Sequence, residues 1–502
     1  MGEIIAFVLY FVAMLTIGVW FFVKTKNNGE KEYFLGGRSM GPWVTAMSAQ
    51  ASDMSAWLLM GLPGSILAFG LGQAWIGIGL AIGTALNWIF VAKRLRKFSK
   101  ASGDAITLPQ YLSNRFSTAN PTLKIICAVV FLISFTIYVA SAFSAGTTVF
   151  TSLFPMLTDE VAMTIFAVII LIYTFMGGFK AVCWTDFFQG LLMLVALLAV
   201  PIVIVCTKTL DTAALNDVYS YVDANGKVVE CVFTSNLFGA SWQEIASGLA
   251  WGLGYFGMPH ILVRFMSIEK PSMVKKSATV AIIWVVITLL AAILIAYFGR
   301  MLLADELLVV GNQKLVFIEF ARRLFPGFIA GLLLAAIIAA SMSTADSQLL
   351  VASSSFTSDI YKPIIRKEAS DKEIMWVGRI VVVIVSVVAF FIASSEGQGA
   401  QAIMNMVENA WGLFGAAFGP VVILSLFWKR FTYKGAVAGI LSGAVVDIVW
   451  LLKLSASTGV YEILPGFIVG LIFSIVVSLI DKRPSPEVEK IFEVATDKNN
   501  DN

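Results

Sequence analysis

Thirteen apolar segments, each long enough to cross a bilayer, constrain this chain more than any other feature. About 20 apolar residues span the hydrocarbon core of a membrane. The chain is 58% hydrophobic and only 13% charged, whereas soluble proteins carry roughly 25% charged residues. We therefore predict an all-α polytopic membrane protein with 13 transmembrane helices. The segments are 4–23, 41–68, 73–92, 123–150, 160–178, 187–206, 241–262, 278–298, 326–349, 374–394, 401–427, 434–452 and 462–481.

The loops between these segments alternate between basic and nearly neutral. Of the 35 Lys and Arg residues, 28, with Arg264 among them, are assigned to the odd-numbered loops and the tail, and 7 to the even-numbered loops. Basic loops remain in the cytoplasm. The pattern predicts a multi-pass protein of the cell (plasma or inner) membrane with its N-terminus outside and its C-terminus in the cytoplasm. The net charge of +3, without a basic stripe, excludes nucleic acid as a partner.

The second and seventh segments are interrupted. The second contains Gly61 and Pro63, and the seventh contains three glycines and Pro259. Each Gly weakens a helix by about 1 kcal/mol and each Pro by about 3 kcal/mol. Broken helices at equivalent places in two halves mark the midplane site of inverted-repeat transporters. The predicted division is 1–40 for a first peripheral helix and cytoplasmic loop, 41–206 for a first five-helix repeat, 207–240 for an external loop, 241–430 for a second repeat, 431–481 for two peripheral spans and 482–502 for a cytoplasmic tail.

Asp53 places a carboxylate near the middle of the second segment. A charge at the bilayer centre costs about 2.5 to 3.5 kcal/mol on insertion scales, so such acids usually have a function. If the helix unwinds here, the carbonyls of Ala51 and Met54 become free to bind a hard cation such as sodium. Freed N–H groups near Ser55 and Trp57 would suit a substrate carboxylate. The alternative is that Asp53 is protonated or holds the helix ends together.

A second oxygen-rich stretch lies in the ninth segment. Ser343 and Thr344 follow Ala340 by three and four residues, so its carbonyl shares a helix face with both hydroxyls. These three oxygens supply most of a sodium shell, and the second segment would supply the rest. The alternative is ordinary, because Ser and Thr in membrane helices often bond back to carbonyls or join neighbouring helices.

Other intramembrane acids extend the set of candidates. Asp186, Asp346 and Ser347 could build a second cation site, although Asp186 at the start of the sixth segment could instead cap its helix. For Glu408 and Asp447 we expect only an outward, hydrated position.

Four aromatic residues could enclose an apolar ring while their indole and phenol groups donate hydrogen bonds: Trp57, Tyr138, Trp251 and Tyr255. Packing against lipid or helices is the alternative for each of them. No nucleophile–base pair or metal cluster supports an enzyme.

These stretches resemble the solute:sodium symporter family from about Phe34 to the last segment. The matching motifs are ASDMSAWLLMGLPG at 51–64, FTIY at 135–138, GGF at 177–179, WTD at 184–186, WGLGYFGMPHIL at 251–262 and FGAAFGP at 414–420. The resemblance implies a leucine-transporter-type core of two inverted five-helix repeats, with spans 1, 12 and 13 peripheral.

The resemblance also implies a function and two sites. It implies a sodium-coupled secondary active symporter that imports L-proline by alternating access, with sodium as the coupling ion. The implied sodium ligands are Ala51, Met54, Ala340, Ser343 and Thr344. The implied substrate residues are Asp53, Ser55, Trp57, Tyr138, Trp251, Tyr255 and Pro259. The alternatives are the same machine acting on another small amino acid or carboxylate, and a membrane sensor with a transporter-like domain.

Overall fold

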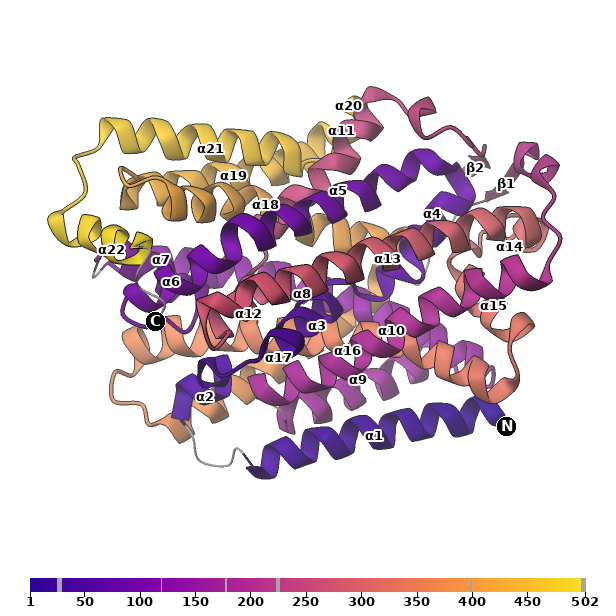
Figure 1. The fold of residues 1–502 in the computed structure, drawn as a ribbon, viewed down its shortest axis with the longest axis horizontal. Coiled ribbons are helices and arrows are strands. Elements are labelled where there is room, and N and C mark those ends of the chain that lie inside the picture. The colour runs from indigo at the N-terminus through magenta and orange to yellow at the C-terminus, as the bar shows by residue number, and fades with distance from the viewer. Residues whose placement is uncertain (25–28, 119, 177, 223–225, 397–399, 498–502) are drawn as a thin grey trace.

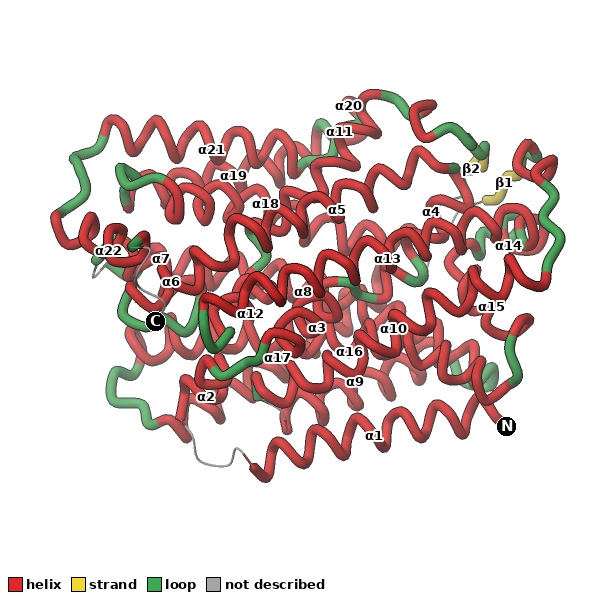
Figure 2. Tube along the Cα trace, viewed as in Figure 1, coloured by secondary structure: helices red, strands yellow, loops and turns green. Residues whose placement is uncertain are grey.

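The structure is a computed structural model that describes the whole chain except residues 25–28, 119, 177, 223–225, 397–399 and 498–502. The described part is helical almost throughout, and its one sheet is the hairpin of β1 (Tyr219–Val222) and β2 (Val228–Cys231) (Figure 2). Within the described residues, ten helices are long and apolar enough to cross a membrane. The prediction of an all-α polytopic membrane protein is confirmed to this extent.

The helices are α1 (Gly2–Lys24), α2 (Gly29–Leu35), α3 (Pro42–Asp53), α4 (Gly61–Phe69), α5 (Ala74–Leu86), α6 (Lys93–Ala101), α7 (Leu108–Arg115), α8 (Thr122–Leu153), α9 (Asp159–Met176), α10 (Phe179–Thr207), α11 (Trp242–Ala250), α12 (Pro259–Ser267), α13 (Val274–Leu302), α14 (Ala304–Leu307), α15 (Val316–Leu324), α16 (Gly327–Phe356), α17 (Asp371–Glu396), α18 (Ala400–Phe427), α19 (Tyr433–Lys453), α20 (Ser455–Thr458), α21 (Ile463–Ile480) and α22 (Pro486–Thr496). Three further helical segments matter below: the 3-10 helices η2 (Ala56–Leu58) and η7 (Trp251–Phe256), and the π-helix η10 (Thr357–Ile365).

Ten of the predicted spans coincide with the ten long apolar helices. The other three coincide with α9 and with two interrupted elements. One of these runs α3, η2, α4, and the other runs α11, η7, α12. Both breaks that glycine and proline predicted are therefore present.

The long helices run side by side, with the peripheral ones at the two edges (Figure 1). At one edge α1 packs on α10 and α16, and at the other α19 and α21 pack on each other and on α18. The N-terminus lies at the end that carries the β-hairpin, and α22, the last helix, lies at the opposite end. An odd number of membrane crossings places the first and last segments of a chain on opposite sides of the membrane.

Two local predictions need correction, and two others gain detail. The helix α10 begins at Phe179, eight residues before the predicted boundary, so Asp186 lies inside the helix and the interpretation as a cap is wrong. The helix α12 continues to Ser267, so Arg264, which was assigned to a loop, is inside a helix and 1% exposed. The predicted external loop contains the β-hairpin. The predicted tail contains α22, which packs on α6, and its last residues, 498–502, lie outside the described part.

Candidate functional site

The first broken span stops at Asp53. Met54 leaves the helical region with φ −81° and ψ 75°, and the Ser55 N–H donates to the Asp53 carbonyl at 3.0 Å instead of to Ala51. Ser55 Oγ then caps η2 by accepting the Trp57 N–H at 3.2 Å. The Ala51 carbonyl is thereby freed for another helix. The N–H groups of Ser55 and Trp57, which we expected to face a substrate carboxylate, donate within the break itself.

The second broken span has a different cause. A capping box of Ser241 and Glu244 starts α11, which then tightens into η7. Pro259 starts α12 at its first position, and proline has no N–H to donate to the carbonyl four residues earlier. That carbonyl belongs to Tyr255, and it accepts a hydrogen bond from Asn87 Nδ2 on another element at 3.0 Å. A side chain from outside the span thus satisfies the carbonyl that the proline leaves without a helical donor.

The two breaks face each other and bring the predicted substrate residues together. The Tyr255 hydroxyl donates to Asp53 Oδ2 at 2.5 Å. The rings of Trp57 and Trp251 stack with centroids 5.5 Å apart and planes 25° apart. Tyr138 on α8 lies beside Asp53. All five side chains are at most 5% exposed. The arrangement is a buried aromatic cluster around one carboxyl group.

Sequence reasoning missed Trp411 on α18, which packs against this aromatic cluster. Its indole Nε1 donates to the Trp251 carbonyl at 2.8 Å, and its ring lies edge-on to Tyr255 at 5.1 Å. Gly254 makes this approach feasible, because a Cβ there would lie 2.0 Å from Trp411 Nε1. The only signal in the sequence was a tryptophan beside the glycines of the eleventh segment.

A pocket of about 280 Å³ lies outside the stacked tryptophans. Its lining includes Trp251, Met404 and Glu408, and Glu244 and Gly459 place it toward the loops that carry the β-hairpin. Trp251 belongs both to this lining and to the stacked pair, whereas Asp53 does not line the pocket. Glu408 lines this pocket and is partly buried. Asp447 does not have the hydrated position that we expected, because it is 1% exposed between helices.

The predicted sodium ligands meet where α3 breaks beside α16. Ser343 Oγ donates to the freed Ala51 carbonyl at 2.8 Å and lies 3.2 Å from the Ala340 carbonyl. Thr344 Oγ1 is buried and has no hydrogen-bond partner among the described residues. Met54 ends α3 in the same break. These are oxygen donors, one of them unsatisfied, and that set fits a hard monovalent cation.

The residues of the predicted second cation site also come together, but around an arginine. Arg264 Nη2 forms an ion pair with Asp186 Oδ2 at 2.9 Å, and both side chains are at most 1% exposed. Arg264 Nε donates to Ser48 Oγ at 2.8 Å, and Ser48 Oγ donates to Asp186 at 2.6 Å. Arg264 also donates to Ser347, whose hydroxyl lies 3.3 Å from Asp346 Oδ1. We call these five residues the Arg264 network.

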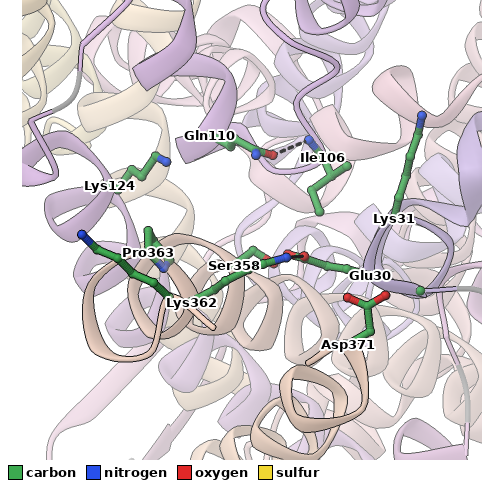
Figure 3. Close-up of a pocket in the computed structure, with 11 residues that line it drawn as sticks. Glu30, Lys31, Ile106, Gln110, Lys124, Ser358, Lys362, Pro363 and Asp371 are labelled. Atoms are coloured by element: carbon green, nitrogen blue, oxygen red, sulfur yellow. Dashed lines mark hydrogen bonds and ion pairs between the residues drawn. The ribbon is translucent and has the colours of Figure 1, made fainter. Parts of the chain in front are cut away.

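A separate pocket of about 670 Å³ is lined mainly by residues of α2, α7, α8 and η10 (Figure 3). The Ile106 N–H donates to Gln110 there, and Lys362 pairs with Glu30. None of the predicted site residues lines it. The lining residues are Gly29, Glu30, Lys31, Ile106, Gln110, Lys124, Ser358, Lys362, Pro363, Lys367 and Asp371. This basic pocket is therefore distinct from the candidate site.

The chain is similar to two curated proline carriers along nearly its whole length. It is 43% identical to the sodium/proline symporter of Escherichia coli, over 98% of this chain and 96% of that protein. It is 40% identical to the osmoregulated proline transporter of Bacillus subtilis, over 98% of this chain and 97% of that protein.

Two solved structures share its fold. A Na+-coupled sialic acid symporter in a substrate-bound outward-open state matches with a TM-score of 0.74 and 20% identity, over 97% of this chain and 98% of that one. Mhp1, a nucleobase-cation-symport-1 family transporter, matches with a TM-score of 0.55 and 14% identity, over 92% and 98%.

The family model described as the sodium:solute symporter family matches residues 33–443. This range includes both broken spans and the oxygen cluster on α16. Together with the identity to the curated relatives, the match covers far more than half of the chain. The protein is a multi-pass membrane transporter, and the chain belongs to the sodium:solute symporter family.

Proposed function

We propose that this protein is a sodium-coupled symporter that imports L-proline by alternating access. The names of the relatives at 40–43% identity support the substrate and the ion. The observation that carries the proposal is the junction of α3 and α16, where the freed Ala51 carbonyl meets Ser343 and where the Thr344 hydroxyl is buried without a partner. A cation there would satisfy both groups.

Sodium is proposed to link the first break to α16 through Ala51, Met54, Ala340, Ser343 and Thr344. In binding, it would replace the Ser343 hydrogen bond to Ala51 with coordination by both oxygens. An ion can shift a conformational equilibrium only if it binds one state better than another. Since the ligands come from two helices, any movement of α3 against α16 changes their spacing. Sodium binding would therefore favour one arrangement of the two helices.

The substrate is proposed to bind between the two breaks, at Asp53, Ser55, Trp57, Tyr138, Trp251, Tyr255 and Pro259. The stacked tryptophans and the two tyrosines offer apolar faces for a pyrrolidine ring. Asp53 would balance the positive charge of the substrate amine. Opening of the tryptophan pair would connect this aromatic cluster to the pocket of about 280 Å³.

The finer architecture is also part of the proposal. We propose 13 spans and two inverted repeats, 41–206 and 241–430, with 1–40 and 431–481 peripheral. The ten long apolar helices together with α9 and the two broken elements support the number of spans. The five-span separation of the breaks supports the repeat. The distribution of basic residues between the loops supports a location in the cell (plasma or inner) membrane. It also supports an N-terminus outside the cell and a C-terminal tail, 482–502, in the cytoplasm.

Purified protein in proteoliposomes tests the function. An inward sodium gradient should drive labelled L-proline above its equilibrium level, and a potassium gradient of the same size should not. A panel of unlabelled small amino acids and carboxylates should compete less well than L-proline. Accumulation of another member of the panel in place of proline would reassign the substrate, and accumulation without sodium would contradict the coupling.

A further inference from the structure

We propose that the basic pocket of about 670 Å³ binds the phosphate group of an anionic phospholipid. The pocket lies among α2, α7, α8 and η10, and no residue assigned to the sodium or substrate site lines it. The proposal goes beyond the transport function and does not depend on it.

The lining of the pocket carries four lysines and two acids, and the lysines come from different parts of the chain. Lys31 lies on α2, Lys124 near the start of α8, Lys362 on η10 and Lys367 in the loop that follows η10. Figure 3 shows Lys124 and Lys31 on opposite sides of the pocket. An anion in the pocket would therefore meet positive charge from more than one direction.

Lys124 and Lys367 are the two lysines that remain available for a ligand. Within the described part of the chain neither forms an ion pair, whereas Lys362 is paired with Glu30 and Lys31 is paired with an acid outside the pocket. Two ammonium groups without a carboxylate partner are suited to one phosphate group.

The other acids near the pocket leave this positive charge in place. Asp371 is the first residue of α17, and a carboxylate in the first turn of a helix is stabilised by the helix dipole. Asp359 lies within electrostatic range of Lys124, but it is 0% exposed and does not line the pocket. The lining thus has two more lysines than acids.

A buried hydroxyl in the lining also lacks a partner. Ser358 on η10 lines the pocket and is 8% exposed, and its Oγ has no hydrogen-bond partner among the described residues. Buried hydroxyl groups are nearly always hydrogen-bonded. A phosphate group would offer acceptor oxygens both to this hydroxyl and to the lysines.

Exposed apolar residues beside the lysines assign the phosphate group to a phospholipid rather than to free phosphate. On α8, Ile125 and Val129 are exposed and follow Lys124 directly, and residues four apart share one face of a helix. At the end of η10, Ile364 and Ile365 are also exposed. Basic pockets beside transmembrane helices bind anionic lipid headgroups on the cytoplasmic side, which is the side that the basic loops assign to this pocket.

The experiment measures binding of dioleoylphosphatidylglycerol to the purified protein in a neutral detergent by native mass spectrometry. Dioleoylphosphatidylcholine has the same acyl chains and no net charge, so it is the reference lipid. We expect phosphatidylglycerol to bind more tightly by a factor of about ten or more. Equal binding of the two lipids would overturn the proposal.

The double variant Lys124→Gln with Lys367→Gln locates the binding. A lysine near an anionic lipid contributes about fivefold in affinity, so this variant should bind phosphatidylglycerol about 30-fold more weakly. Lys270→Gln with Lys275→Gln is the matched control, because both are exposed lysines outside the pocket, and it should bind as the parent does. An equal loss in both double variants, or no loss in the first, would show that the pocket is not the lipid site.

Inorganic phosphate and the double variant Ile364→Ser with Ile365→Ser distinguish a phospholipid from free phosphate. We expect the isoleucine variant to bind phosphatidylglycerol more weakly, and an excess of inorganic phosphate to leave the lipid bound to the parent. If inorganic phosphate displaced the lipid and the isoleucine variant bound it unchanged, the phosphate group would come from solution and the lipid assignment would be wrong.

Discussion

Two oxygen clusters lie next to each other on α16, and their partners differ. At Ser343 and Thr344 the neighbouring groups are backbone carbonyls, and one hydroxyl has no partner among the described residues. At Asp346 and Ser347 the neighbour is the Arg264 guanidinium. The first cluster lacks a positive charge and the second contains one. Under the proposed function, the first cluster would hold an ion that binds and dissociates, whereas the second holds a positive charge that is part of the protein.

The energetics of the two clusters differ accordingly. A buried hydroxyl without a partner costs about 1–3 kcal/mol, and a visiting ion offsets that cost only while it is bound. A buried ion pair gives little net stability, but removing one partner costs about 3–5 kcal/mol because the other charge remains buried. We call Ser343 and Thr344, at the proposed sodium site, the sodium cluster. The stability of this cluster should therefore depend on the ion concentration, whereas that of the Arg264 network should change mainly on mutation.

The largest expected effect is on the stability of Arg264→Gln. Asp186 loses its ion-pair partner at a site 0% exposed, so we expect a loss of about 3–5 kcal/mol in sodium-free buffer. Thermal unfolding in detergent, followed by tryptophan fluorescence, measures it as a lower Tm. The double variant Asp186→Asn with Arg264→Gln removes both charges and should recover part of the loss. A single variant as stable as the parent would show that the two clusters do not differ in this way.

Tyr255→Phe should have the next largest effect. It removes the hydroxyl that donates to Asp53 Oδ2 at 2.5 Å and with it a hydrogen bond that joins the two breaks. A hydrogen bond to a charged group contributes about 1.5–3 kcal/mol, which predicts a KM for L-proline raised by roughly 10- to 150-fold if substrate binding needs that bond. Uptake kinetics at saturating sodium measure the change. Tyr297→Phe, on α13, is the control and should leave KM within twofold.

Thr344→Val should separate function from stability at the sodium cluster. The substitution keeps the shape but removes a hydroxyl that has no protein partner among the described residues. We expect the sodium concentration for half-maximal uptake to rise about tenfold, or about 1.4 kcal/mol, with the sodium-free Tm unchanged or higher. Thr288→Val is the matched control, because that hydroxyl donates to the Trp284 carbonyl at 2.8 Å. Unaltered sodium activation in Thr344→Val would remove this residue from the site.

The smallest effect is expected at Asp104, an exposed counterpart of the buried pair. Its side chain is 40% exposed and accepts a hydrogen bond from Arg38 at 2.8 Å. Partial burial raises the pKa of Asp104, but the hydrogen bonds and charges of Lys31 and Arg38 lower it by more, so the pKa lies below its usual value. The ion pair therefore adds stability above the unfolded-state pKa of about 4, and that stability is lost as the pH falls through the lowered folded-state pKa.

Asp104→Asn should accordingly cost at most about 1 kcal/mol at pH 7. The difference in Tm between this variant and the parent should shrink when the pH is lowered below 4. A difference that stays constant with pH would mean that hydrogen bonding by the side chain, rather than its charge, stabilises this turn.

Hydropathy and helix-breaking residues predicted the positions of the long helices and of both breaks. Gly61, Pro63 and Pro259 carry that information locally, because each affects the backbone at its own position. Asp53, Tyr255 and Trp251 could be named as candidates for the same reason, since a polar or aromatic group at a break is visible along the chain.

The pairing of Asp186 with Arg264 could not be predicted in this way. The apolar segment used for the prediction ended before Arg264, so a charge that belongs inside α12 was counted with the loop. A buried acid requires a cation, and Arg264 was the nearest basic residue beyond the seventh segment. That requirement could have indicated that Arg264 is buried with an acid, but it does not specify which acid forms the ion pair with it. Asn87 and Trp411 lie on other elements, and only the tertiary packing brings them to Tyr255.

The two interruptions differ in whether they can be reversed. At Tyr255 the missing donor is a consequence of covalent structure, because Pro259 has no amide hydrogen in any conformation. At Ala51 the donor exists, since Ser55 has an N–H that now bonds to Asp53. The break at Tyr255 is therefore fixed by the covalent chain, whereas the second span keeps a donor that could return to the Ala51 carbonyl when that carbonyl is not held from α16. Pro63 leaves the Leu59 carbonyl without a helical donor in the same way, so only the turn at Ala51 can change. An ion bound at the Ala51 carbonyl would keep that turn open.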